Sequence, residues 1–211
     1  MVTLICDTLS SMDSSLLLAI NGHHNAVLDS IMYTASNKLI WIPMYMMLFF
    51  VVIKDLGLRK ATVWLLFLIL AITISDQITS GILKPLVGRL RPSNLDNPIS
   101  EYIHIVYGYR GGSHGFASSH AANSFCLAFY WIFTKQRKFI GYVLVTWSLI
   151  ICYSRIYLGV HYPGDVATGI AIGIFCARNT ADIRIHSSLT KHYVSSSMKK
   201  KRQSYSKNMN R

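Results

Sequence analysis

The sequence predicts an all-α fold: a polytopic membrane bundle of about five transmembrane helices, preceded by an N-terminal helix lying in the membrane interface. Of the 211 residues, 52% are hydrophobic and only 14% are charged. A soluble domain carries about a quarter charged residues. The apolar residues also form long uninterrupted runs instead of the amphipathic periods of soluble helices. The bilayer is therefore the expected solvent of this chain.

The segment that precedes the first apolar run, Leu16–Met32, mixes apolar positions with Asn, His and Asp residues. Such a mixture suits a helix in the interface plane better than a membrane span. No basic stretch with a short apolar core and a small-residue cleavage site comes before it, so we expect no secretory signal peptide.

Five apolar runs without Lys, Arg, Asp or Glu are expected to span the membrane. The second extends to Leu83, past an aspartate. The first and last are short against the roughly 20 residues that a hydrocarbon core requires, so we expect their flanking residues to lie at the interface. The runs are Leu39–Ile53, Ala61–Ser75, Gly115–Thr134, Phe139–Ser154 and Val166–Ala177.

The remaining segments complete a single predicted domain. Between the second and third runs, Ser93–Gly112 holds Pro, Asn, Gly and the only Glu of the chain, and we expect an extramembrane loop. Residues 1–185 are predicted to form one membrane-embedded domain. Residues 186–211 are basic and polar, and we expect a disordered tail that touches water or lipid headgroups.

Lys and Arg residues are divided unevenly between the two sides of this predicted bundle. Three follow the first run, three follow the third, and nine follow the fifth. By the positive-inside rule, the side that carries the other six faces away from the cytoplasm. Those six are Lys38, Lys84, Arg89, Arg91, Arg110 and Arg155.

Polar residues gather at the run ends on this non-cytoplasmic side. Cations near a bilayer are costly unless they are used, so the gathering predicts a functional site. Its members are Lys84 and Arg91 after the second run, His120 near the start of the third, Arg155 at the end of the fourth, and His161 and Asp165 before the fifth.

These residue types suit phosphate chemistry. The guanidinium groups of Arg91 and Arg155 match phosphate oxygens bidentately, and Lys84 adds a compact charge. The backbone amides of Ser118 and Ser119, near a predicted helix N-terminus, would add oriented donors. Together they would form a cradle for a phosphate and for the charge that develops in its transition state.

Two histidines would divide the chemical work. His161 is the predicted nucleophile because Asp165, four residues on, can hold one imidazole N–H and leave the other nitrogen free. His120 is then the acid that protonates the leaving group. Two-metal phosphatases need several converging carboxylates and histidines, whereas the acids near this face are few, so we predict no metal and no other cofactor.

Three spaced motifs in these residues resemble those of the type 2 phosphatidic acid phosphatase superfamily. Lys84 to Pro92 matches K-x6-R-P, Ala117 to His120 resembles P-S-G-H, and Ser154 to Asp165 matches S-R-x5-H-x3-D. The resemblance covers about residues 76–173. Two positions depart from it, Ala117 for Pro and Ser119 for Gly, and we expect them to change loop stiffness and the substrate pocket.

The resemblance implies a helical membrane core and a metal-independent phosphohistidine mechanism. It also implies His120 as the acid, and phosphate ligands at Lys84, Arg91, Ser118, the backbone of Ser119, and Arg155. By analogy with small bacterial members, we expect a phosphatase of undecaprenyl diphosphate or lipid A type in the inner membrane, with a periplasmic site and a cytoplasmic tail.

Alternatives to hydrolysis remain at this point. A second lipid instead of water could attack the phosphohistidine, which would make the protein a lipid-to-lipid phosphotransferase. A non-catalytic protein could bind or transport phospholipids, although a transporter should show inverted repeats and broken midplane helices, and neither is evident. Membrane topology already explains the basic tail, so we expect no nucleic-acid partner.

The sequence leaves the roles of three further charged residues open. Arg89 and Arg110 either contact phosphate or headgroups, or only extend to the interface. Asp76 lies inside the second run, where we expect a buried structural partner for a polar group of the first run.

Overall fold

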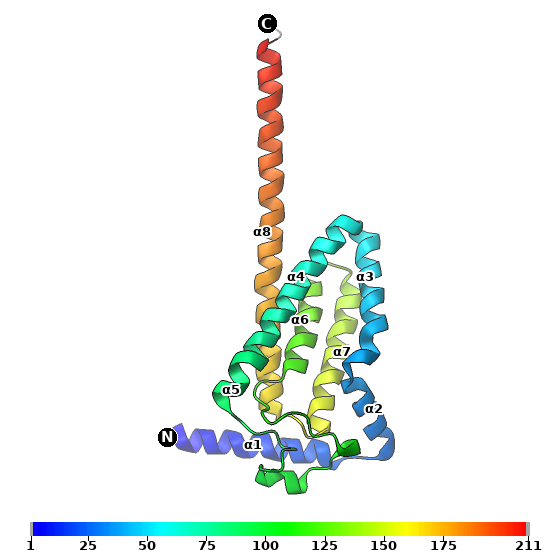
Figure 1. Ribbon diagram of the computed structural model, residues 1–211, viewed down its shortest axis with the longest axis vertical. Coiled ribbons are helices and arrows are strands. Elements are labelled where there is room, and N and C mark those ends of the chain that lie inside the picture. The colour runs from blue at the N-terminus through cyan, green and yellow to red at the C-terminus, as the bar shows by residue number, and fades with distance from the viewer. Residues whose placement is uncertain (1, 210–211) are drawn as a thin grey trace.

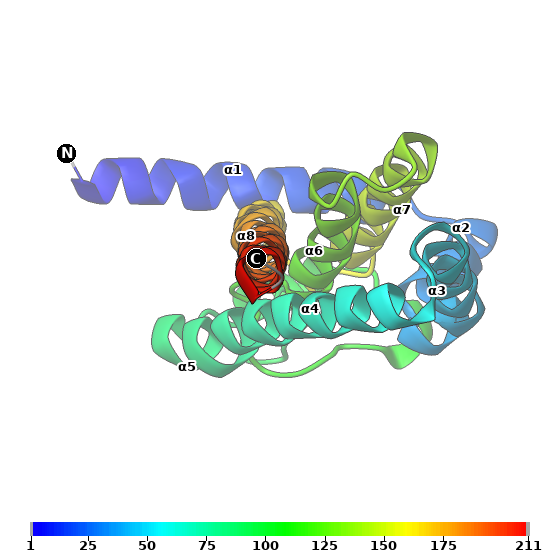
Figure 2. The same cartoon turned by 90° about the horizontal axis from the view of Figure 1, so that it is seen from above.

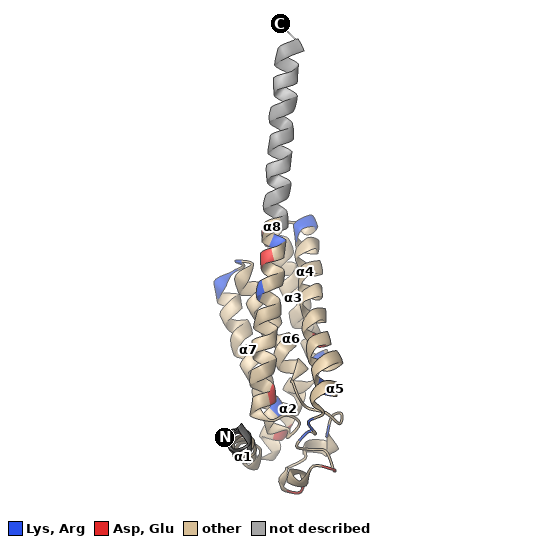
Figure 3. Cartoon of the chain, turned by 90° about the vertical axis from the view of Figure 1, so that its left-hand side faces the viewer, with Lys and Arg blue, Asp and Glu red and all other residues tan. Residues whose placement is uncertain are grey.

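A bundle of long helices dominates the computed structural model, which describes residues 10–186 in full and only the helical backbone of residues 2–9 and 187–209 (Figure 1). The charged residues of the described part lie mostly toward the two ends of the bundle (Figure 3). The bundle helices are α3 (Ile42–Leu56), α4 (Leu58–Asp76), α6 (Ser119–Phe133), α7 (Lys138–Tyr157) and α8 (Pro163–Met209).

Two helices precede the bundle where the sequence predicted one over Leu16–Met32. Helix α1 (Val2–Gly22) lies crosswise at one end of the bundle, and α2 (Ala26–Ser36) leads from it toward α3 (Figures 1 and 2). The break occurs because the Asn25 side chain accepts a hydrogen bond from the Leu28 amide at 2.9 Å, which caps a new helix. The single-helix prediction is therefore wrong, while the crosswise position of α1 fits an interfacial role.

Three of the predicted runs coincide with helical segments that are long and apolar enough to cross a membrane: Lys38–Leu56, Leu58–Val87 and Lys138–Tyr157. Helix α6 has 15 residues, or about 22 Å at 1.5 Å per residue, which is less than a hydrocarbon core. The helical bundle is confirmed, and the count of five spans stays a prediction. Of the predicted tail, residues 186–211, only residue 186 has a described side chain. The prediction for the rest of the tail lies outside the described side chains.

Helix α6 is the central helix of the bundle, since it packs against α4, α7 and α8 and most of its residues are buried. Its neighbours therefore shield a helix that is too short to span alone. The predicted third run begins too early, because residues 115–118 belong to the preceding loop.

Two glycines let α8 approach α6 closely. A Cβ atom on Gly169 would lie 2.4 Å from the Ser118 carbonyl oxygen, and one on Gly173 would lie 2.1 Å from that of Ala122. Small residues four apart are a common means of close helix packing in membranes. The approach also brings the Ser118 amide to within 2.9 Å of the Asp165 carbonyl oxygen, so the second and third motifs meet here.

The long loop between α4 and α6 is tied to the rest of the fold through Asn21 of α1. Its side chain donates to the carbonyl oxygens of His104 at 3.0 Å and Tyr157 at 2.7 Å, and it accepts from the His104 amide at 2.8 Å. Asn21 is only 1% exposed, so these hydrogen bonds satisfy a buried polar group. Helix α1, the loop and the end of α7 are thereby held together at the side where the predicted site lies.

Candidate active site

Lys84 begins the short helix α5 (Lys84–Val87), directly after the π-helical turn η2 (Gln77–Leu83). Its ammonium group donates to the hydroxyl of Ser119 at 2.8 Å and to that of Ser80 at 3.0 Å. Single π-helical turns are frequent at functional sites. Ser119, which departs from the motif glycine, is therefore a neutral acceptor that orients the lysine.

Arg155 is 1% exposed in the last turn of α7. Its two terminal nitrogens donate to the hydroxyl of Ser36 and, at 3.2 Å, to that of Tyr109. Its Nε has no hydrogen-bond partner among the described atoms. A buried donor without an acceptor is costly, so this N–H group is suited to an incoming anion.

Arg91 is held inside the long loop by backbone groups. Its Nε donates to the carbonyl oxygen of His114 at 3.1 Å, and a terminal nitrogen lies 3.4 Å from that of Val160. Gly111 closes over it with φ +71°, and a Cβ at that position would lie 2.6 Å from the guanidinium. The chain needs glycine there for both the backbone conformation and the close approach.

The positive charges of Lys84, Arg91 and Arg155 are not neutralised by ion pairs. No carboxylate within residues 10–186 pairs with any of the three. Buried or half-buried cations without a carboxylate partner favour an anionic ligand strongly. All three side chains lie near enough to His161 for their charges to act on its imidazole. Their role as phosphate ligands stays a prediction.

His161 lies in the connection between α7 and α8 and is 1% exposed. Its Nδ1 is 3.5 Å from Asp165 Oδ2. Burial, together with the positive charges of Arg155, Arg91 and Lys84, holds the pKa of His161 well below its usual value. The imidazole is therefore neutral, which is the form that a nucleophile requires.

Asp165 is fully buried in the first turn of α8, and three groups surround its carboxylate. Oδ1 accepts from Arg89 at 2.9 Å, and Oδ2 accepts from the Tyr162 amide at 3.0 Å while facing His161. The aspartate reaches back to the residue before the helix, as the third residue of a capping box does. His161 precedes the helix, so its closeness to Asp165 comes from this helix cap.

The start of α6 places Ser118, Ser119 and His120 beside this group. The Ser118 amide already donates to the Asp165 carbonyl oxygen, so the prediction that it is a free donor for phosphate is wrong. The Ser118 hydroxyl is buried and has no described partner. Amides in the first turn of a helix lack intrahelical acceptors, so those of Ser119 and His120 remain suited to an anion.

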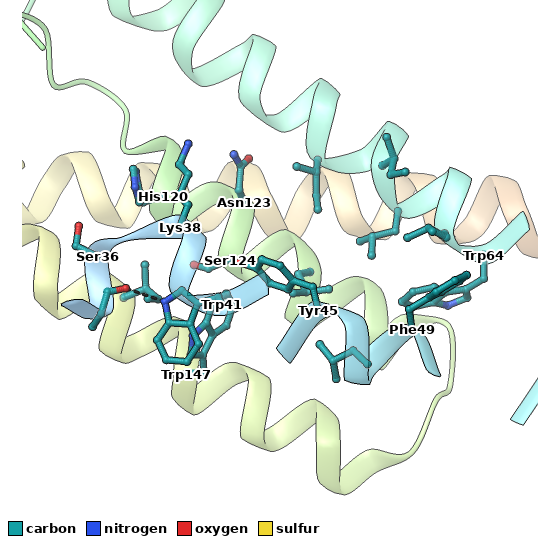
Figure 4. Close-up of a pocket in the computed structure, with 18 residues that line it drawn as sticks. Ser36, Lys38, Trp41, Tyr45, Phe49, Trp64, His120, Asn123, Ser124 and Trp147 are labelled. Carbon is teal, nitrogen blue, oxygen red and sulfur yellow. Dashed lines mark hydrogen bonds between the residues drawn. The ribbon is translucent and has the colours of Figure 1, made fainter. Parts of the chain in front are cut away.

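A cavity of about 430 Å³ runs from His120 into the bundle between α3, α4, α6 and α7 (Figure 4). Lys38, Ser36 and Asn123 share its polar end with His120. Apart from Ser124, the rest of the lining is apolar and aromatic. Trp41 and Trp147 meet edge to face with ring centroids 5.5 Å apart. A pocket with one polar end and a long apolar body suits a lipid chain attached to a charged group.

Several contacts at the site were not predicted from the sequence. Arg89 pairs with Asp165 and with Asp13 of α1. Two carboxylates therefore hold its guanidinium, and it does not extend freely to the interface. Arg110 donates to the Ser93 carbonyl oxygen at 2.7 Å within the loop. Asp76 accepts from Asn123 of α6 at 3.1 Å, which corrects the expected partner in the first run.

The fold and this site together define an integral membrane protein with a cationic, histidine-containing pocket at one end of a helical bundle. Residues 61–185 match the PAP2 superfamily. The chain therefore belongs to the PAP2 superfamily, and the resemblance in its three motifs is confirmed.

Relatives and a solved structure agree with this assignment. The lipid A 4′-phosphatase of Bacteroides thetaiotaomicron is 43% identical over 79% of this chain and 74% of its own length. Undecaprenyl-diphosphatase BcrC of Bacillus subtilis is 28% identical over 77% and 79%. The crystal structure of Aquifex aeolicus LpxE has a TM-score of 0.61 at 26% identity, covering 80% of this chain and 93% of that one. These similarities support phosphatase activity on a lipid.

Proposed function

We propose that this protein is a metal-independent phosphatase that hydrolyses a phosphate monoester on a glycolipid of the lipid A type, through a phosphohistidine on His161. The observation that carries the proposal is the apolar cavity that ends at His120, beside three cations that have no carboxylate partner among residues 10–186. A lipid phosphate matches both parts, since its chain suits the cavity and its phosphate suits the cations.

In the proposed reaction, Lys84, Arg91 and Arg155 bind the phosphate oxygens. Nε2 of His161 forms the new N–P bond while the bond between phosphorus and the lipid oxygen breaks. His120 gives its proton to that oxygen, so the lipid leaves as an alcohol. His120 then takes a proton from water, whose oxygen attacks phosphorus, and phosphate leaves as His161 is regenerated.

Asp165 is proposed to keep His161 in the correct tautomer. An N–H at Nδ1 would donate to Oδ2, and Nε2 would keep the free electron pair that the attack requires. Because Asp165 is also held by Arg89 and the Tyr162 amide, its carboxylate cannot turn away from the histidine without losing two hydrogen bonds.

The character of the site supports metal independence. Metal ions in phosphatases neutralise phosphate charge and are themselves held by carboxylates and histidines. Here one lysine and two arginines would supply that neutralisation, and the carboxylate beside His161 is already paired with Arg89. A site with this excess of positive charge disfavours a divalent cation.

The relatives support a lipid A type of substrate over the second candidate, a polyprenyl diphosphate. The lipid A 4′-phosphatase is 43% identical to this chain, against 28% for the undecaprenyl-diphosphatase. The uneven distribution of Lys and Arg supports an active site on the periplasmic side of the inner membrane, with the C-terminal tail in the cytoplasm.

The test is phosphate release by the detergent-purified protein in the presence of EDTA, with lipid A carrying a 4′-phosphate and undecaprenyl diphosphate offered separately. The account expects EDTA-resistant loss of one phosphate from lipid A, detected by mass spectrometry, and none with His161→Ala. If the protein prefers undecaprenyl diphosphate, the proposed substrate is wrong and the proposed mechanism stands. Loss of activity in EDTA that added metal restores would contradict metal independence.

A further inference from the structure

Among the described residues of helix α1, Asp13 contacts the active site with its carboxylate. Asp13 Oδ2 accepts a hydrogen bond from a terminal nitrogen of Arg89 at 2.7 Å, and its Oδ1 accepts from the Gly164 amide at 2.7 Å. The other terminal nitrogen of Arg89 donates to Asp165 at 2.9 Å. Hydrogen bonds therefore run from α1 through Arg89 to Asp165, whose Oδ2 lies 3.5 Å from Nδ1 of His161, an atom that has no hydrogen-bond partner among the described atoms.

The contact with Gly164 completes the cap of α8. The residue before the helix is Tyr162, whose side chain cannot accept a hydrogen bond from the second or third amide as Ser, Asp or Asn does. Asp13 supplies that acceptor from another helix, and its negative charge also lies at the positive end of the α8 dipole. A Cβ on Gly164 would lie 3.0 Å from the Asp13 carboxylate, so the residue at this position must be small.

Arg89 is fixed on three sides. Its guanidinium lies between the two carboxylates and over the ring of Tyr162, 3.7 Å from the centroid. It therefore does not face the phosphate site, although it belongs to the first motif. The guanidinium neutralises and orients Asp165, and Asp13 is its second carboxylate partner.

The position of α1 itself is set elsewhere along the helix. Leu17 is fully buried against Ile103 and Tyr162, and Asn21 holds the long loop. These contacts dock α1 without help from Asp13. The carboxylate can therefore be removed by substitution while the helix stays in place.

We propose that Asp13 is a positioning residue for the nucleophile, acting through Arg89 and Asp165 to fix the orientation of the His161 imidazole. This inference rests on the proposed function of His161. In the chain without the Asp13 carboxylate, Arg89 keeps one carboxylate partner, and the single amide oxygen of an asparagine at position 13 cannot serve both Arg89 and the Gly164 amide as the two carboxylate oxygens do. Asp165 then has more freedom to turn away from Nδ1, and fewer imidazoles point their free nitrogen at the phosphate.

The experiment compares full-length wild-type protein with Asp13→Asn, Asp13→Glu and Leu17→Ala. Turnover is measured with lipid A carrying a 4′-phosphate, and kcat and KM are separated. We expect Asp13→Asn to lower kcat roughly tenfold to a hundredfold and to leave KM within about twofold, because the binding cations are untouched. Asp13→Glu should recover most of the loss. Leu17→Ala should lower the thermal midpoint and leave kcat unchanged.

A second measurement separates orientation from folding and from activity. In protein labelled with 15N-histidine, the His161 signals are assigned by their absence in His161→Asn. Asp13→Asn should shift the balance between the Nδ1-protonated and Nε2-protonated forms of His161, and Leu17→Ala should not. Wild-type kcat together with unchanged His161 signals in Asp13→Asn would overturn the proposal. So would an equal loss of kcat in Leu17→Ala.

The two proposals fail in different ways. If the wild-type protein hydrolyses none of the lipid phosphates offered, the proposed function is wrong, and the NMR comparison alone decides whether Asp13 orients His161. If the wild-type protein is active and Asp13→Asn equals it in kcat and in spectrum, only the role of Asp13 is wrong.

Discussion

Lys84 donates a 2.8 Å hydrogen bond to Ser119, the residue that stands where the family motif has glycine. Ser80, one helical turn before the lysine, accepts from the same ammonium group at 3.0 Å. The two hydroxyls hold the long lysine side chain without neutralising its charge. A departure from the motif has thus become part of the proposed phosphate cradle.

Replacing Ser119 by glycine tests this relationship. Ser119→Gly removes one of two acceptors of a charged donor, and we expect kcat/KM for the lipid substrate to fall roughly twofold to tenfold, which corresponds to about 0.5–1.5 kcal/mol. Ser80→Ala is the matched control, and the double variant should lose more than the two single losses combined. A Ser119→Gly enzyme as active as wild type would show that Lys84 needs no such support.

The low pKa of His161 leads to a prediction on its protonation. Burial and three nearby cations lower the pKa of His161, because both favour the neutral ring. The imidazole therefore stays neutral as the pH falls below 6.5. A 15N-histidine NMR titration from pH 8 to pH 5 should show no protonation step for His161. A step near pH 6.5 would mean that the ring is more hydrated than its 1% exposure indicates.

Filling the cavity should impair long-chain substrates selectively. Leu127 lines the cavity from α6 and is 6% exposed, so Leu127→Trp places a larger side chain where we propose the lipid chain. We expect kcat/KM for lipid A to fall roughly tenfold or more, and hydrolysis of the short soluble ester para-nitrophenyl phosphate to change little.

The control for this change is Leu149→Trp on α7, a position that is 53% exposed and lies outside the cavity lining. It should leave both activities near the wild-type level. Equal losses on the short and long substrates in Leu127→Trp would show that the cavity does not hold the lipid chain.

Much of the site was predictable because its residues are chemically conspicuous at apolar run ends. Lys84, Arg91, Arg155, His161 and Asp165 interrupt or bound long hydrophobic segments, where charge is costly without a use. They converge in the fold because successive helices run in opposite directions. The end of one apolar run and the start of the next therefore lie on the same side of the bundle.

Other parts of the site left no such signal in the sequence. Asp13 lies far along the chain from Gly164 and Arg89, in a segment where a polar residue at the interface is unremarkable. Ser36 and Tyr109 meet Arg155 only through tertiary packing. The Ser118 amide was misjudged because its acceptor, the Asp165 carbonyl oxygen, depends on the close approach of α6 and α8.

Two predicted helix boundaries were wrong for local reasons. The break between α1 and α2 depends on the side chain of Asn25, which competes with the helix for a backbone amide. The start of α6 at Ser119 depends on the loop that precedes it, not on the absence of Lys, Arg, Asp and Glu, which extends back past Gly115.

The most direct test of the central claim is to look for phosphate on His161. Wild-type protein is mixed with 32P-labelled lipid A, quenched in alkali during the first turnovers, digested and examined by mass spectrometry. The account predicts an alkali-stable phosphate on His161 that is absent in His161→Ala. Label on another residue, or turnover in wild type with no phosphoenzyme under conditions that preserve phosphohistidine, would contradict it.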